Sequence, residues 1–215
     1  WGLPEVARRI AAAALPDGGP AACVAEIGVG AGALTEELLD RPGCERVVGF
    51  EVDSELLQGA LRRPSLRRAG IAVRPLPAEA ASWARRDWRA ATCQRRAEEG
   101  GGRCLVFQGD VLACGSLPGE CHVAVGNLPY RISTGIVARL LTQWPPLTRI
   151  VLLTQAEFAR RLSARPGSPK YGRLAVLAAL GCAARAAVVV PRVPPEAFSP
   201  PPRVDSTVVS LSPAQ

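Results

Sequence analysis

The 215-residue sequence has no methionine, a single histidine and seven cysteines that form no CxxC pair. A lone histidine with scattered cysteines does not supply the spaced ligand sets of zinc sites. An odd number of cysteines is also not typical of a disulfide framework, so we expect reduced, mostly buried thiols and no bound metal. His122 precedes the apolar residues 123–125, which favours a strand edge over a catalytic role for this side chain.

Long hydrophobic runs are absent too. No stretch is long enough to cross a bilayer, and nothing at the start is typical of a signal peptide, so we expect no membrane partner. The chain begins at Trp1 and lacks methionine, from which we expect a fragment of a longer product that could have carried a targeting segment. A hydrophobic share of 48% and a charged share of 21% predict one globular domain over residues 1–215.

Positive charge is concentrated in one segment. Residues 62–103 hold eleven arginines against four acidic residues, whereas the rest of the chain balances at fifteen of each sign. This segment therefore supplies the whole formal net charge of +7. The pattern indicates a nucleic-acid contact, although a solvated surface loop gives the same count.

Apolar runs of strand length alternate with segments of helical spacing along most of the chain. We expect strands over residues 24–27, 46–50, 104–107, 123–125, 150–154, 186–190 and 207–211, the last two forming a hairpin. We expect helices over residues 4–15, 34–39, 54–61, 82–99, 134–144, 156–164 and 171–180, with Ser54 as the cap of the third. Such alternation predicts an α/β fold whose mostly parallel sheet is covered by helices on both faces and binds ligands at the carboxyl ends of its strands.

A glycine-rich turn joins the first strand to its helix. Gly28, Gly30 and Gly32 allow the backbone to turn sharply and to approach a ligand closely. A strand, a glycine turn and a helix N-terminus together suit a nucleotide-like ligand. Gly28, Gly30 and Ala33 also satisfy the relaxed dinucleotide fingerprint, so at this point NAD stays open, as does a tight turn without any ligand.

Three polar side chains follow the next strands at the point where each ends. Glu51 comes about twenty residues after the glycines, where a carboxylate can accept both ribose hydroxyls. Asp110 follows the third expected strand and could accept a hydrogen bond from an adenine amine. Asn127 follows the fourth, so the three side chains are expected at one edge of the sheet.

Residues 127–130, Asn-Leu-Pro-Tyr, favour methylation of an amino group over hydride transfer. The exocyclic amine of adenine is a poor nucleophile because its lone pair is delocalised into the ring. The Asn127 amide oxygen and the carbonyl that precedes Pro129 can accept its two N–H bonds and free that lone pair for attack on a methyl group. Tyr130 supplies a flat face for an unstacked base. A strand-to-turn break with a buried tyrosine is the plain structural alternative.

Several stretches resemble the small-subunit rRNA adenine dimethyltransferases, the bacterial KsgA type with its organellar and eukaryotic relatives. Four of them, in this order, are EIGVGAGALTEELL, FEVDSEL, FQGDVL and VGNLPYRIST. Two more specific ones are TQAEFARRLSARPGSPKYGRLAV and VPPEAFSPPPRVDSTVVSL. The resemblance implies a Rossmann-like methyltransferase fold and S-adenosylmethionine-dependent dimethylation of adjacent adenines in small-subunit rRNA, coupled to ribosome biogenesis. A catalytically silent RNA-binding assembly factor and, more weakly, a nicotinamide-dependent oxidoreductase are the alternatives.

The resemblance also implies roles for individual residues. The cofactor S-adenosylmethionine would be held by Glu26, Gly28, Gly30, Glu51, Asp110, Val111 and Asn127. The target amine would be gripped by Asn127, Leu128 and Pro129, and the base would lie between Tyr130 and Phe198. The partners implied are small-subunit rRNA and the pre-ribosomal small subunit.

The sequence also departs from the family pattern. Val29 stands where the family has proline, and the N-terminal GQNFL-type segment and C-terminal helical domain of the family are absent. The insertion over 62–103 interleaves Trp83 and Trp88 with arginines, which could bind RNA or a ribosomal protein; a solvated loop whose tryptophans cover the helix beneath is the alternative. Composition favours an intracellular site, and a mitochondrion over a plastid or a bacterial cytoplasm.

Overall fold

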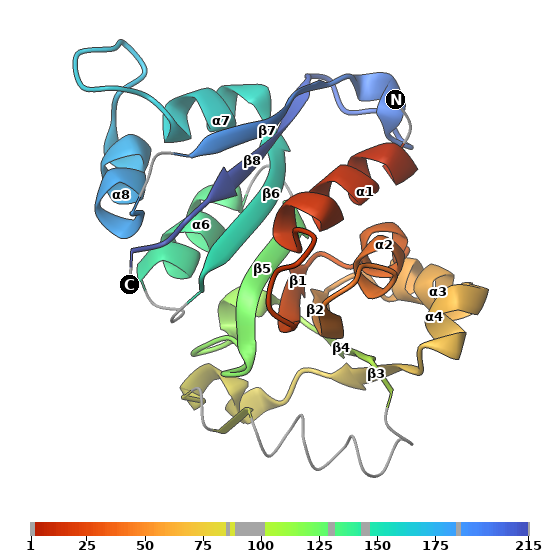
Figure 1. Ribbon diagram of the computed structural model, residues 1–215. Coiled ribbons are helices and arrows are strands. Elements are labelled where there is room, and N and C mark those ends of the chain that lie inside the picture. Colours follow the sequence, from red (N-terminus) through yellow and green to blue (C-terminus); the bar gives the residue numbers. More distant parts are fainter. Residues whose placement is uncertain are drawn as a thin grey trace.

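The computed structural model describes residues 3–84, 87–88, 102–128, 132–142, 147–183 and 186–214. Within these ranges eight strands form one sheet in the order β3-β4-β2-β1-β5-β6-β8-β7 (Figure 1). The strands are β1 (Ala22–Ile27), β2 (Cys44–Glu51), β3 (Ile71–Pro75), β4 (Cys104–Gln108), β5 (Cys121–Asn127), β6 (Arg149–Gln155), β7 (Ala187–Val193) and β8 (Ser206–Leu211). The α-helices are α1 (Leu3–Ala14), α2 (Ala33–Leu39), α3 (Ser54–Arg62), α4 (Pro64–Arg68), α6 (Ser133–Thr142), α7 (Ala156–Leu162) and α8 (Arg173–Gly181).

The first six strands pair in parallel, with β1 at the centre. Ala25 of β1 lies beside Val48 of β2 on one side and Ala124 of β5 on the other. The chain therefore leaves β1 in one direction to build β2, β4 and β3, and later crosses to the other side for β5 and β6. The strand order reverses between β1 and β5, which in such sheets is where ligands bind. The expected Rossmann-like α/β fold is confirmed.

Apolar side chains form two cores, one on each face of the sheet. On one face α1 buries Val6 and Ile10, which recur at helical spacing, together with side chains of α2, α3 and α4. On the other face α6, α7 and α8 cover the sheet. Among the described residues no helix combines the length and the apolar character needed to cross a bilayer.

The last two strands form the expected hairpin, but their order in the sheet is not the order in the chain. β8 pairs antiparallel with both β6 and β7, so the final strand lies inside the sheet and β7 lies at its edge. The proline-rich loop between them contains a 3-10 turn, η3 (Pro195–Ala197). Phe198 follows this turn directly.

The structure corrects the interpretation of the 62–103 insertion. Instead of merely interrupting the alternation, it adds α4, the edge strand β3 and a 3-10 turn, η1 (Ala78–Ser82). Trp88 is fully buried and contacts the rings of Phe50 and Phe107 at centroid distances of 5.8 and 5.2 Å. The Trp88 indole N–H donates to the Ser116 carbonyl at 3.0 Å. Trp88 therefore belongs to the core and has no free face for a base.

The start of α3 and the helix expected over residues 82–99 differ from the sequence prediction in what the structure describes. The cap of α3 is Asp53 and not Ser54, because the Asp53 carboxylate accepts from the Glu55 and Leu56 amides. Of the helix expected over 82–99, residues 85–86 and 89–99 lie outside the described residues. Five of the six described cysteines are buried and all six are free thiols, as expected.

Candidate functional site

All three glycines of the turn that follows β1 lie in the left-handed region, Gly32 with φ of +83°. Gly28 has φ of +79° and Gly30 has φ of +56°, conformations that glycine adopts readily and other residues do not. A β-carbon on Gly28 would lie 3.4 Å from the Asn127 carbonyl oxygen, so the turn passes close to the end of β5. A β-carbon on Gly30 would meet nothing within 4 Å, so this side of the turn is open. The turn can therefore receive a ligand along its Gly30 side.

Glu51 ends β2 directly beside this turn, and the residue is only 8% exposed. One carboxylate oxygen accepts from the Gly30 amide at 2.8 Å. The other oxygen accepts from the amides of Val52 at 2.8 Å and Asp53 at 2.9 Å. Three backbone donors thus fix the carboxylate at the edge of the sheet, where its remaining lone pair can accept from a ligand hydroxyl.

Glu26 lies beneath the turn and is completely buried. Its Oε2 accepts from the Thr35 hydroxyl at 2.7 Å, and its Oε1 has no partner among the described residues. Burial, aided by the negative charge of Glu51 and opposed by the Thr35 hydrogen bond, raises the pKa of Glu26 to about 8. The raised pKa favours the protonated carboxyl near neutral pH, and the hydrogen bond to Thr35 ties β1 to the first turn of α2. A contact of Glu26 with a cofactor stays a prediction.

The loop after β4 carries Asp110 and Val111. Its first amide, of Gly109, donates to the Glu51 carbonyl at 2.8 Å, which joins the ends of β4 and β2. The exposed Asp110 caps the 3-10 turn η2 (Val111–Ala113) by accepting from the Leu112 amide at 2.8 Å, while Val111 is buried. Asp110 is thus exposed at the carboxyl edge, one residue beyond the Gly109–Glu51 hydrogen bond, and its contact with an adenine amine stays a prediction.

Asn127 ends β5, and its side chain is exposed at the same edge. Leu128 is buried, and its amide donates to the Leu153 carbonyl of β6 at 3.1 Å. Pro129 and Tyr130 lie outside the described residues. Phe198 is partly buried and packs against the core on the α1 face. Its expected position opposite Tyr130 stays a prediction.

Sequence reasoning missed a contact that the insertion makes with this edge. The Leu76 amide, just after β3, donates to the Gln108 carbonyl at 2.9 Å. A β-carbon on Gly109 would lie 2.5 Å from the Leu76 β-carbon, so Leu76 packs directly over Gly109. The apolar residues 71–73 were the signal for this extra strand, although they are few and flanked by arginine and proline.

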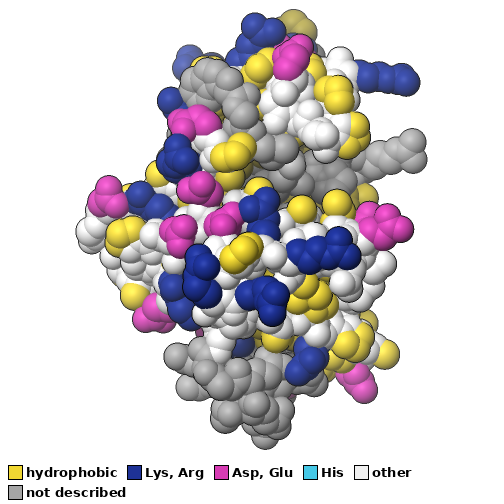
Figure 2. Space-filling view, turned by 90° about the vertical axis from the view of Figure 1, so that its right-hand side faces the viewer, with side chains coloured by type: hydrophobic (Ala, Val, Ile, Leu, Met, Phe, Trp, Pro, Cys, Tyr) yellow, Lys and Arg dark blue, Asp and Glu magenta, His cyan; other side chains and the backbone are white. Residues whose placement is uncertain are grey.

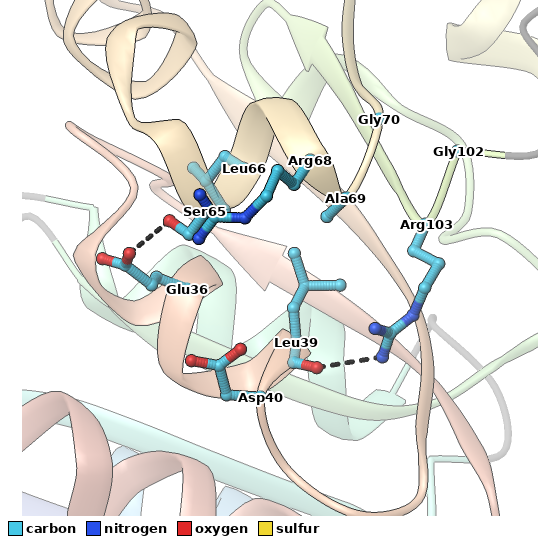
Figure 3. A pocket seen from close by; sticks show the side chains of 10 residues that line it. All are labelled: Glu36, Leu39, Asp40, Ser65, Leu66, Arg68, Ala69, Gly70, Gly102 and Arg103. Carbon is cyan, nitrogen blue, oxygen red and sulfur yellow. Dashed lines mark hydrogen bonds between the residues drawn. The ribbon is translucent and has the colours of Figure 1, made fainter.

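A hollow of about 420 Å³ lies elsewhere, between α2, α4 and the start of β4 (Figure 3). Three of its polar side chains already have partners. Glu36 binds Arg63 and Ser65, and Arg103 donates to the Leu39 and Cys44 carbonyls. None of the predicted site residues lines it. We therefore place the functional site at the carboxyl edge and not in this hollow.

The surface charge of the insertion is only partly neutralised. Arg62, Arg67 and Arg68 are exposed on α3 and α4, and their side chains form no hydrogen bond or ion pair with the described residues. Figure 2 views the molecule from the side of α3 and α4 and shows basic side chains across that face, with acidic ones between them. This face is a candidate for contact with a polyanion.

The strand order and the polar groups at its switch point define a Rossmann-like α/β domain with a candidate ligand site at the carboxyl edge of its sheet. Residues 4–215 match the family model described as ribosomal RNA adenine dimethylase, so the chain belongs to that family.

Individual relatives agree with this assignment. The ribosomal RNA small subunit methyltransferase A of Mesorhizobium japonicum is 37% identical over 202 residues, which cover 88% of this chain and 59% of the relative. The crystal structure of a dimethyladenosine transferase from Plasmodium falciparum is similar over 98% of this chain and 62% of that one, with a TM-score of 0.69 and 27% identity. The chain thus spans about three fifths of the length of these relatives.

A more distant neighbour supports the fold alone. It is a putative class I S-adenosylmethionine-dependent methyltransferase from Listeria monocytogenes, with a TM-score of 0.59 and 11% identity over 99% of this chain and 59% of that one.

Proposed function

We propose that this chain catalyses S-adenosylmethionine-dependent dimethylation of adjacent adenines in small-subunit rRNA, as part of ribosome small-subunit biogenesis. The observation that carries the proposal is the approach of the Asn127 backbone to Gly28. It places the residue that would grip the target amine next to the turn that would receive the cofactor. Similarity to proteins named as an rRNA methyltransferase and a dimethyladenosine transferase supports the same reaction.

The described residues fit S-adenosylmethionine. The open side of Gly30 leaves room beside the backbone of the turn. The Glu51 carboxylate is fixed where it can accept from ribose hydroxyls, and the exposed Asp110 carboxylate can accept from the adenine amine. When bound, S-adenosylmethionine supplies an electrophilic methyl group on a sulfonium sulfur.

Asn127 and Leu128 would act on the acceptor. The Asn127 amide oxygen and the Leu128 carbonyl would accept the two N–H bonds of the target amine, which draws the nitrogen toward tetrahedral geometry and exposes its lone pair. Hydrogen bonds that strengthen as positive charge develops on the nitrogen stabilise the transition state more than the ground state. The amine would then lose a proton to water and keep one N–H bond. Once the spent cofactor is exchanged for a second S-adenosylmethionine, one of the two acceptors would hold that remaining N–H bond for the second methylation.

The proposal is tested with methyl-labelled S-adenosylmethionine and small-subunit particles whose rRNA lacks the modification. We expect the label to appear as dimethyladenosine when the rRNA is digested and analysed by mass spectrometry. Binding of the cofactor and the particle without any transfer of label would contradict the proposal, and would favour a silent assembly factor.

A further inference from the structure

Helix α6 contacts the Asp110 loop at two places. Near its start, a β-carbon on Gly135 would lie 3.7 Å from Cδ1 of Leu112, so the Leu112 side chain lies close to the backbone of the helix. One turn later, Nη1 of Arg139 donates to the carbonyls of Leu112 at 2.6 Å and Cys114 at 2.7 Å. The Arg139 guanidinium therefore bridges the two carbonyls that end the 3-10 turn η2.

The Leu112 residue is consequently held from both sides. Its amide donates to the Asp110 carboxylate at 2.8 Å, and its carbonyl accepts from Arg139 at 2.6 Å. A continuous path of hydrogen bonds and one residue of backbone thus links the Asp110 carboxylate to α6. A shift of α6 would be passed to Asp110 through these bonds.

Helix α6 also follows the proposed acceptor site directly, since it begins at Ser133, shortly after residues 127–130. We propose that Arg139 is a positioning residue that fixes the Asp110 loop to α6. It thereby keeps the binding site for the cofactor's adenine at a fixed position relative to the site for the target amine. This inference rests on the proposed function. Arginine suits the task because its planar, always charged guanidinium can bridge two acceptors rigidly, whereas lysine presents a flexible point charge.

The chain offers a matched control for the purely structural effect of such a bridge. Nη2 of Arg103 donates to the carbonyls of Leu39 at 2.9 Å and Cys44 at 2.6 Å. Figure 3 shows the bond to Leu39. Arg103 precedes β4, so it lies at the amino edge of the sheet, opposite the proposed site. Arg103→Lys removes a bridge of the same kind without touching the cofactor edge.

The test measures binding of S-adenosylhomocysteine by calorimetry to the wild-type chain, Arg139→Lys and Arg103→Lys, with thermal melting of each. We expect both variants to melt earlier, but only Arg139→Lys to bind about tenfold more weakly. With small-subunit particles, Arg139→Lys should raise KM for S-adenosylmethionine more than it lowers kcat. Equal affinity of wild type and Arg139→Lys, or equal weakening by Arg103→Lys, would overturn the inference.

If Arg139→Lys is strongly destabilised, a double-mutant cycle with Asp110→Asn still separates an effect through Asp110 from a general loss of stability. Because Arg139 is inferred to act through Asp110, its effect on affinity should shrink in the Asp110→Asn background. Full additivity of the two substitutions would count against the inference. A wild-type chain that binds no S-adenosylhomocysteine would overturn the proposed function itself, and this inference with it.

Discussion

The Glu51 carboxylate and the Gly30 amide, 21 residues apart in the sequence, are joined by a 2.8 Å hydrogen bond across the ends of β2 and β1. The same carboxylate accepts from the amides of Val52 and Asp53. The residue that would bind the ribose therefore also fixes the glycine turn, so that cofactor binding and local backbone order depend on one side chain.

Glu51→Gln should weaken both cofactor binding and the stability of the folded chain. The amide nitrogen of glutamine would face a backbone N–H donor, and the charge that strengthens these hydrogen bonds would be lost. We expect a loss of about 2 kcal/mol in the free energy of unfolding and at least about tenfold weaker S-adenosylmethionine binding. Urea titration and calorimetry measure the two quantities. Glu45→Gln, exposed at the other end of β2, is the control, and wild-type affinity in Glu51→Gln would refute the assigned role.

Glu26 gives a pH dependence of stability. Its pKa is about 8 in the folded chain, whereas the ordinary value is 4.5. Between these values the folded state holds a proton that the unfolded state has released, so the free energy of unfolding falls as pH rises from about 4.5 to 8. Glutamine does not titrate, so the free energy of unfolding of Glu26→Gln should not fall in this way. Relative to wild type, the variant should therefore become more stable by a few kcal/mol between pH 5 and pH 8.5.

Denaturant unfolding of wild type, Glu26→Gln and Glu45→Gln across this pH range checks the expectation. The exposed Glu45 serves as the control, and its substitution should leave the wild-type slope intact. Parallel pH profiles of wild type and Glu26→Gln would show that Glu26 is charged in the folded chain.

Whether the insertion contributes to RNA binding is best tested by removing its positive charges and not by deleting the segment. Deletion would remove β3 and the fully buried Trp88, and would damage the core. Replacing both Arg67 and Arg68 by glutamine should weaken binding to small-subunit particles and reduce the slope of log affinity against log salt by roughly two. Filter binding at several salt concentrations measures this.

The control for that experiment is the α1 pair Arg8→Gln with Arg9→Gln, which makes the same change in net charge. Both of these arginines are paired with Glu5. An equal reduction of the slope by both double variants would mean that only net charge matters, and not the α4 surface.

The sequence predicts the positions of the polar residues at the strand ends better than it predicts the structure of the insertion. Glu51, Asp110 and Asn127 could be placed at one edge because each directly follows a short apolar run, and parallel strands end together. β3 was missed because residues 71–73 are a short run among arginine, proline and glycine. The place of Trp88 stayed open between RNA binding and packing, because its burial depends on Phe50 and Phe107, which are distant in the sequence.

The chemical state of Glu26 and the bridge made by Arg139 could not be predicted from the sequence either. The raised pKa of Glu26 depends on the burial of its carboxyl beneath the turn. The role of Arg139 depends on two carbonyls brought to it by the loop after β4. Both are tertiary contacts that leave no local pattern.

The central claim is that the side chain of Asn127 acts on the target amine while the turn beside it holds the cofactor. The most direct measurement compares Asn127→Ala with His122→Ala, an exposed residue at the opposite end of β5. We predict that Asn127→Ala binds S-adenosylhomocysteine at most about tenfold more weakly than wild type but transfers methyl groups to small-subunit particles at least about a hundredfold more slowly, so that the loss in transfer exceeds the loss in cofactor affinity. His122→Ala should match wild type in both. Methyl transfer by Asn127→Ala at the wild-type rate would contradict the account.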